Sequence, residues 1–161
     1  MRAIALAGLL AIPSVLVAQQ SGDLSTPLAK SKQYVSYEAE EQAVKAGKRS
    51  VVEMRFRVMD GYHVNSHTPK SELLIPTALK LDTADGVKAE AVQYPAGTQY
   101  SFSFEPGEKL DVYTGVFTVK VPVTVVAGAH TLIGALRYQA CDNAACYPPK
   151  TLPVQLVLKA K

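Results

Sequence analysis

The chain has 161 residues, enough for one domain, and 48% of them are hydrophobic. It carries 17 Lys and Arg residues against 14 Asp and Glu, a formal net charge of +3, and neither sign forms a long run. A nucleic-acid-binding surface needs a concentrated basic patch, so this composition argues against a nucleic-acid partner.

Residues 1–18 are typical of a secretory signal peptide. A positively charged start precedes an apolar run that ends in the small residue Ala18. An uncleaved membrane anchor is the alternative, but the run is short for a span and contains Pro13. We therefore expect export with cleavage near Ala18, a flexible lead-in over residues 19–32, and a single domain over residues 33–161.

The domain is patterned like a series of β-strands. In residues 50–59 apolar side chains alternate with mostly charged ones, which is typical of a half-buried strand. Residues 38–47 are the one candidate helix, and they are short enough to be a strand and turn instead. Short strands separated by Gly and Pro predict an all-β antiparallel sandwich. The other predicted strands are residues 74–81, 87–94, 111–126, 129–140 and 151–159.

The only two cysteines, Cys141 and Cys146, lie in the stretch RYQACDNAACYPPKT with four residues between them. In an exported protein such a pair is expected to form a disulfide. If the cysteines face each other across a hairpin, their Cα atoms are about 4.5–5.5 Å apart, which a disulfide accepts.

Three interpretations of the pair are possible. A structural staple across so short a loop would stabilise the fold by only about 2 kcal/mol. A redox-exchange centre would require an accessible sulfur. A metal site would need further ligands such as His63 and His67, but their spacing suits a helix rather than the strand and loop expected there, so we expect no metal. Staple and exchange both stay open on spacing alone.

The stretch YQACDNAACYPPKTLPVQL, residues 138–156, resembles the active-site hairpin of the N-terminal domain of the thiol:disulfide interchange protein DsbD. MDGYHVNSHTP (59–69) and YPAGTQYSFSFEPGEKLDVYTGVFTVKVPVTV (94–125) are similar to two further segments of that family, and the likeness covers residues 34–159. The resemblance implies an immunoglobulin-like sandwich that carries electrons in the periplasm without a small-molecule cofactor. Its implied acceptors are periplasmic thioredoxin-fold proteins.

This sequence departs from the family in two ways. The loop between the cysteines is one residue shorter than in the best-known members, and the membrane and C-terminal thioredoxin domains of full-length members are not part of it. We therefore expect a separate membrane protein as the electron donor. The competing hypothesis is a non-catalytic exported binding module whose disulfide only shapes a loop.

The resemblance also assigns roles to the hairpin. It implies that Cys146 forms the mixed disulfide with a partner and that Cys141 resolves it. Pro148 and Pro149 lack backbone N–H groups, so the chain after Cys146 cannot pair normally there and is left open for docking.

Further residues are expected around the disulfide. The resemblance implies a cap over the cysteines, for which Phe104, or otherwise Phe102, is the candidate aromatic residue. His63 and Asn65 share one face of a strand and match positions where the family places aromatic residues beside the disulfide. The tyrosines nearest the cysteines are expected either to pack in the sandwich or to shield the disulfide; they are Tyr138 and Tyr147.

Overall fold

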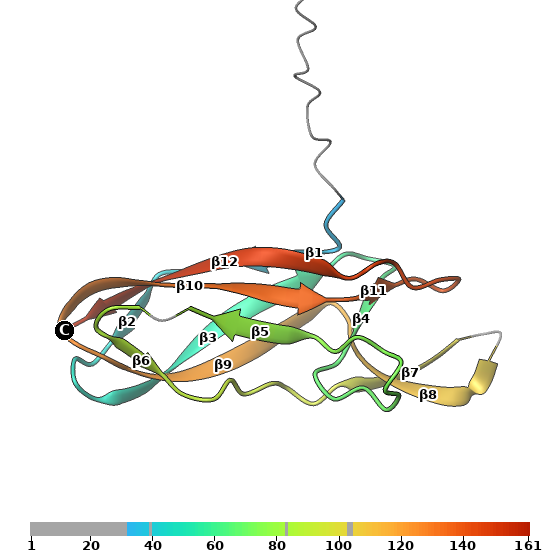
Figure 1. Cartoon of the computed structure of the whole chain (residues 1–161), viewed down its shortest axis with the longest axis horizontal. Coiled ribbons are helices and arrows are strands. Elements are labelled where there is room, and N and C mark those ends of the chain that lie inside the picture. The colour runs from blue at the N-terminus through green and yellow to red at the C-terminus, as the bar shows by residue number, and fades with distance from the viewer. Residues whose placement is uncertain (1–31, 39, 83, 103–104) are drawn as a thin grey trace, which may run out of the picture. The chain divides into compact units, whose positions relative to one another are not determined.

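The computed structural model describes residues 32–38, 40–82, 84–102 and 105–161. The regular secondary structure in this part of the chain consists of β-strands alone (Figure 1). None of the described residues forms a helix that is long and apolar enough to cross a membrane. In chain order the strands are β1 (Val35–Glu38), β2 (Gln42–Val44), β3 (Arg49–Val58), β4 (His63–Asn65), β5 (Ala78–Leu81), β6 (Val87–Ala89), β7 (Thr98–Phe102), β8 (Glu105–Tyr113), β9 (Val116–Val125), β10 (Gly128–Tyr138), β11 (Ala140–Cys141) and β12 (Lys150–Ala160).

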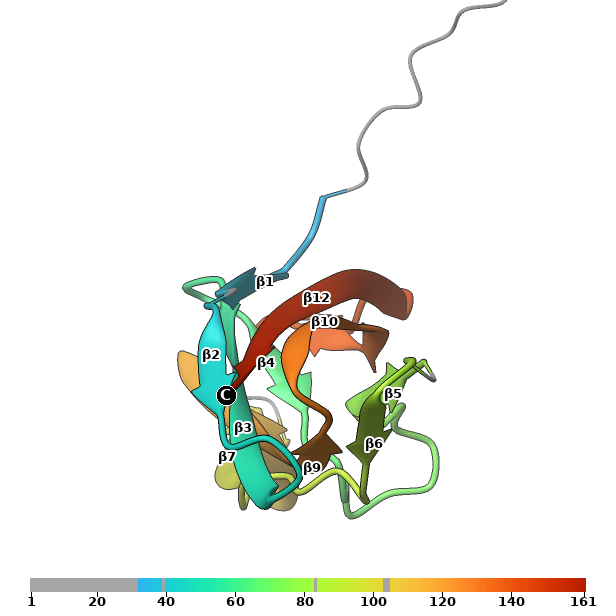
Figure 2. The ribbon, with the colours of Figure 1, turned by 90° about the vertical axis from the view of Figure 1, so that its left-hand side faces the viewer.

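Two four-stranded sheets form the sandwich. One has the strand order β1-β3-β9-β6 and faces the other, β2-β12-β10-β5, across the core (Figure 2). Every pairing in these two sheets is antiparallel except that of β2 with β12, which is parallel. The prediction of an all-β, immunoglobulin-like antiparallel β-sandwich is confirmed, with this one parallel pair as an addition.

The core is built from the alternating side chains of the long strands. In β3 every second side chain from Val52 to Val58 is 1% exposed or less, while the side chains between them face solvent, in line with the alternation predicted for residues 50–59. Burying each such side chain contributes roughly 1.5–3 kcal/mol relative to leaving it in water. The central core residues are Val52, Met54, Phe56 and Val58 in β3, Val119, Val121 and Val123 in β9, Leu132 and Leu136 in β10, and Leu156 and Leu158 in β12.

Residues 111–126, expected to form one strand, are instead divided between two sheets. β8 ends at Tyr113, β9 begins at Val116, and Gly115 between them has a φ of 57°. Glycine adopts this left-handed conformation without the steric penalty that a Cβ atom brings. The apolar alternation runs on through the turn, so periodicity alone did not reveal it.

The prediction of a helix over residues 38–47 is wrong, and the alternative prediction of a strand and a turn is confirmed. β1 ends at Glu38, β2 follows, and a turn with Gly47 at a φ of 66° leads into β3. The side-chain amide of Gln42 donates to the carbonyl of Glu53 at 2.6 Å and accepts from its N–H at 3.0 Å. These tertiary hydrogen bonds override the helix propensity of the Ala and Glu residues.

A third sheet, with the order β11-β4-β8-β7, lies at one end of the sandwich, on the right in Figure 1. A single residue, Gln139, separates the core strand β10 from β11, so the chain passes directly from the sandwich into this sheet. This connection places Cys141 at the junction between the core and the third sheet. The predicted strands over 74–81 and 87–94 are shorter in the structure, where they correspond to β5 and β6.

Candidate functional site

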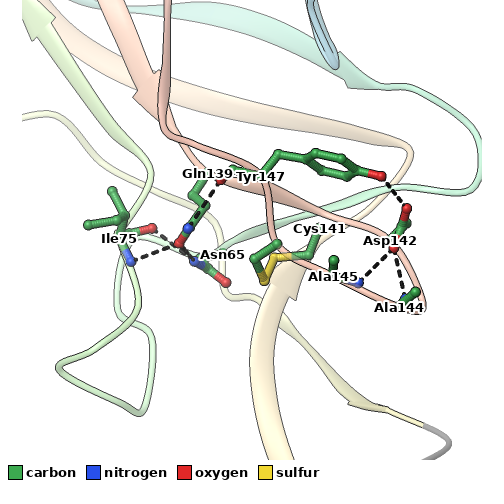
Figure 3. The surroundings of a disulfide bond; sticks show 9 residues. Asn65, Ile75, Gln139, Cys141, Asp142, Ala144, Ala145 and Tyr147 are labelled. Carbon is green, nitrogen blue, oxygen red and sulfur yellow. Dashed lines mark hydrogen bonds between the residues drawn. A yellow bond between two sulfur atoms is a disulfide. The ribbon is translucent and has the colours of Figure 1, made fainter.

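The two cysteines form the disulfide expected from their spacing (Figure 3). The S–S distance is 2.02 Å, and the Cα atoms are 3.9 Å apart, closer than the 4.5–5.5 Å expected across a regular hairpin. Cys141 ends β11, and Cys146 faces it in an isolated antiparallel bridge. The bond therefore closes a tight loop at the end of the third sheet.

The two cysteines differ sharply in exposure. Cys141 is 0% exposed, because β11 pairs with β4 and lies against the core. Cys146 is exposed, and so are Pro148 and Pro149 that follow it. The Cys146 side of the hairpin therefore faces solvent, whereas the Cys141 side is covered by protein.

Asp142 organises the loop between the cysteines. Its Oδ1 accepts hydrogen bonds from the N–H groups of Ala144 at 2.8 Å and Ala145 at 2.9 Å, and its Oδ2 accepts one from the Tyr147 hydroxyl at 2.5 Å. These hydrogen bonds hold the pKa of the Asp142 carboxyl below its usual range, and the bond from the Tyr147 hydroxyl has the largest effect. The same carboxylate raises the pKa of Tyr147 to about 12. Sequence reasoning missed Asp142, although Asp is a residue whose side chain commonly bonds the backbone two residues on in turns.

Tyr147 joins this loop to the sandwich. Its ring stacks on Tyr34 with centroids 5.0 Å apart and lies 6.0 Å from the ring of Tyr62. Two ammonium groups lie over this aromatic cluster: Lys32 Nζ is 4.8 Å from the Tyr62 centroid, and Lys150 Nζ is 5.7 Å from that of Tyr34. Tyr147 thus packs on the sandwich through its ring and contacts the cysteine loop through its hydroxyl.

Tyr138 lies in the core rather than on the surface of the loop. It is 0% exposed on β10, and its hydroxyl accepts the N–H of Tyr34 at 3.1 Å and donates to Gln33 Oε1 at 2.7 Å. These contacts fit the expectation that Tyr138 packs in the sandwich, and they tie the segment before β1 to it.

His63 lies beside Cys141 because the two residues are directly paired between β4 and β11. The imidazole is 2% exposed and its ring centroid lies 4.1 Å from that of Tyr100. Burial lowers the pKa of His63, and the nearby negative charge of Asp142 only partly opposes this. Burial therefore disfavours the charged imidazolium form of the side chain next to Cys141.

Asn65 and Gln139 brace the chain just before Cys141. Asn65 Nδ2 donates to the carbonyl of Ile75 at 3.0 Å and to Gln139 Oε1 at 3.2 Å (Figure 3). Gln139 Oε1 also accepts the N–H of Ile75 at 3.3 Å, and its Nε2 donates to the carbonyl of Tyr147 at 3.2 Å. Gln139, which sequence reasoning missed, thereby connects both ends of the hairpin to β4.

The predicted cap lies only partly within the described residues. Phe104 lies outside them, and of Phe102 only the backbone, at the end of β7, is described, so a cap formed by either side chain stays a prediction. Tyr100, earlier in β7, reaches the site: besides its contact with His63, its hydroxyl donates to Asn143 Oδ1 at 2.5 Å.

His67, weighed with His63 as a metal ligand, has other neighbours. Its ring stacks on Tyr94 with centroids 3.7 Å apart, and its Nδ1 lies 2.9 Å from the carbonyl oxygen of Thr77. Among the described residues no group of three or more His, Cys, Asp or Glu side chains is placed to hold a metal ion.

Comparison with known proteins places these residues in a family. The family model described as "Thiol:disulfide interchange protein DsbD, N-terminal" matches residues 31–158. No curated protein was found as a sequence relative.

Solved structures with a similar arrangement include DsbD domains. The reduced N-terminal domain of DsbD from Neisseria meningitidis is 25% identical, with 68% of this chain and 78% of that one covered and a TM-score of 0.43. A complex between the DsbD N-terminal and PilB N-terminal domains from the same organism gives 23% identity, 65% and 73% coverage and a TM-score of 0.42. The N-terminal periplasmic domain of ScsB from Proteus mirabilis, 11% identical, gives a TM-score of 0.51 over 76% of this chain and 44% of that one, a likeness of fold alone.

Proposed function

Because the chain belongs to the family of N-terminal domains of the thiol:disulfide interchange protein DsbD, we propose that it passes electrons in the periplasm through Cys141 and Cys146. The electrons come from a membrane reductant and go to thioredoxin-fold proteins. The observation that carries the proposal is the asymmetry of the disulfide, in which Cys146 is exposed and Cys141 is completely buried.

Electron delivery proceeds in two exchange steps. In the reduced domain, the Cys146 thiolate attacks the partner's disulfide, and one partner sulfur leaves with the electron pair of that bond. The Cys141 thiolate then attacks Cys146 Sγ in the mixed disulfide, and the second partner sulfur leaves as a thiolate. The partner has gained two electrons, the Cys141–Cys146 disulfide has formed, and the membrane reductant restores the thiols by the reverse exchange.

The site favours the second step through proximity. The Cα atoms of the two cysteines are 3.9 Å apart, so Cys141 attacks a sulfur that the fold already holds beside it. The exposed prolines after Cys146 leave room for the partner's chain on the outer side of the hairpin. Burial lowers the pKa of His63 and so disfavours a positive charge next to the Cys141 sulfur.

A trapping experiment tests the proposal. In Cys141→Ala, Cys146 has no internal resolving thiol. This variant is mixed with a thioredoxin-fold partner that lacks its own resolving cysteine and whose remaining cysteine is activated as a mixed disulfide with thionitrobenzoate. The Cys146 thiolate displaces thionitrobenzoate from that sulfur, so a mixed disulfide between the two proteins should accumulate on a non-reducing gel. Cys146→Ala should trap far less, and the double variant measures non-specific capture. Equal trapping by both single variants would remove the assigned asymmetry.

The reduction potential separates exchange from the alternative of a binding module. A structural disulfide has a potential below about −300 mV, whereas an exchanging one lies higher. A potential typical of structural bonds, together with no trapping by either variant, would favour the binding module.

A further inference from the structure

The loop between the cysteines is closed by hydrogen bonds that do not involve sulfur. The N–H of Asp142 donates to the carbonyl of Ala145 at 2.9 Å, and the N–H of Tyr147 donates to the carbonyl of Ala140 at 2.8 Å. The Asp142 carboxylate accepts the N–H groups of Ala144 and Ala145. None of these bonds requires the disulfide, so all of them can persist after its reduction.

One of the side-chain contacts joins the two sides of the loop. The Tyr147 hydroxyl donates to Asp142 Oδ2 at 2.5 Å, and each of these residues directly follows one of the cysteines. A hydrogen bond to a carboxylate is roughly twice as strong as one between neutral groups. The bond therefore holds together the two chain segments that the disulfide also joins.

Tyr147 is itself fixed to the sandwich. Its ring stacks on Tyr34, and its carbonyl accepts a hydrogen bond from Gln139 Nε2. A carboxylate bonded to this hydroxyl is thereby held against the body of the domain rather than only against its own loop. The contact restricts where the exposed Cys146 can move when it is no longer bonded to Cys141.

We propose that Asp142 and Tyr147 form a latch that positions the two thiols of the reduced domain for reaction with each other. Its use in electron transfer rests on the proposed exchange function. The latch and the disulfide hold the same segments, so each favours formation of the other, and this coupling is reciprocal. Both are positioning residues: they raise the effective concentration of Cys141 at Cys146 and so stabilise the oxidised form and speed resolution of the mixed disulfide.

The test uses the isolated domain and glutathione. Tyr147→Phe keeps the ring on Tyr34 and removes only the hydroxyl. We expect the equilibrium constant for forming the Cys141–Cys146 disulfide from glutathione disulfide to fall about threefold to tenfold, where tenfold corresponds to about 30 mV in reduction potential. Asp142→Ala should lower it at least as much, since it also removes the acceptor for two loop N–H groups.

Tyr62→Phe is the matched control. Tyr62 belongs to the same aromatic cluster, but its hydroxyl accepts a hydrogen bond from Lys32 Nζ at 2.9 Å, and Lys32 is not a residue of the cysteine loop. We expect the equilibrium constant for disulfide formation in this variant to stay within about twofold of the value for the unmodified protein. A twofold change corresponds to less than about 0.5 kcal/mol, since a factor of ten corresponds to roughly 1.4 kcal/mol. An equal shift in this variant would overturn the latch in favour of a general effect of the cluster.

Two further readouts keep the outcomes distinct. Thermal unfolding of the reduced variants checks that the fold is intact. If Tyr147→Phe does not fold, Asp142→Ala, which changes only the loop, provides the equilibrium measurement instead. Unchanged equilibria in both Tyr147→Phe and Asp142→Ala would overturn the latch. Trapping of a partner by Cys141→Ala depends only on Cys146, so it can succeed when the latch fails and fail when the latch holds.

Discussion

At the scale of single residues, the neighbours of the two cysteines make them different. Cys141 is covered by β4 and paired with the buried His63, whereas Cys146 is exposed and followed by two exposed prolines. Reactivity of a thiol requires both the thiolate form and access to it. Because both side chains are cysteines, the difference in exposure is what makes Cys146 the expected point of attack in the proposed exchange.

Alkylation of the reduced protein should reveal this difference. With a limiting amount of iodoacetamide, we expect Cys146 to be modified about tenfold faster than Cys141, because only an accessible thiolate reacts. Peptide mass spectrometry after brief labelling measures the ratio. Comparable rates at the two sites would contradict the burial of Cys141 in the reduced domain.

His63 should make stability depend on pH. Burial lowers its pKa below the value near 6.5 that it has in the unfolded chain. As the pH falls through 6.5, the unfolded state therefore binds a proton that the native state does not, and the free energy of unfolding decreases. In His63→Phe, which keeps a ring at this position, the decrease between pH 7.5 and pH 5.5 should be smaller, as measured by urea unfolding at both values. An identical pH dependence in the two proteins would show that His63 contributes nothing to it.

At the scale of elements, the sequence predicts a strand well when its apolar alternation is regular and stops at the turn that ends the strand. The pattern of residues 50–59 corresponds to β3, and residues 151–159 fall within β12. Residues 111–126 were not divided correctly, because the apolar alternation continues through Gly115 while the chain changes sheets. Local sequence alone makes residues 38–47 a candidate helix, because the pairing of β2 with β12 is a long-range interaction that local sequence does not contain.

Gly134 is an element-scale test of how closely β5 packs on β10. A Cβ atom at this position would meet the backbone carbonyl of Lys80 and the side chain of Leu81. Gly134→Ala should therefore destabilise the domain by roughly 1–3 kcal/mol, the usual range for overpacking. Gly107→Ala, where an added Cβ has no atom of the described residues within 4 Å, is the control. Urea unfolding of both variants measures the difference, and equal stabilities would show that β5 yields freely.

At the scale of the whole molecule, the core lies in the two large sheets and the disulfide lies at one end of the third. The family and the two cysteines could be identified from the sequence, because the hairpin motif is contiguous. The supporting network could not, because its partners are distant in the chain: Asn65 and Gln139, which share a hydrogen bond, are 74 residues apart. Periodicity reports which face of a strand is buried but not which side chains meet across strands.

Reduction should leave the fold intact. The disulfide closes a loop with a sequence separation of only 5, so its loss should lower the free energy of unfolding by about 2 kcal/mol. Urea unfolding with and without a thiol reductant measures this value, and circular dichroism checks that the reduced domain keeps its sheets. Unfolding on reduction would instead indicate that the bond is a structural staple.

The direction of β12 has a practical consequence. The strand begins at Lys150, shortly after the cysteine hairpin, and its 11 residues end at Ala160, at the opposite end of the sandwich (Figure 1). At about 3.3 Å per residue, such a strand spans roughly 35 Å. A domain attached to an electrode or a resin through its last residue would therefore hold its disulfide on the side facing the solution. Immobilised molecules would share one orientation, with their sulfur atoms directed toward soluble partners.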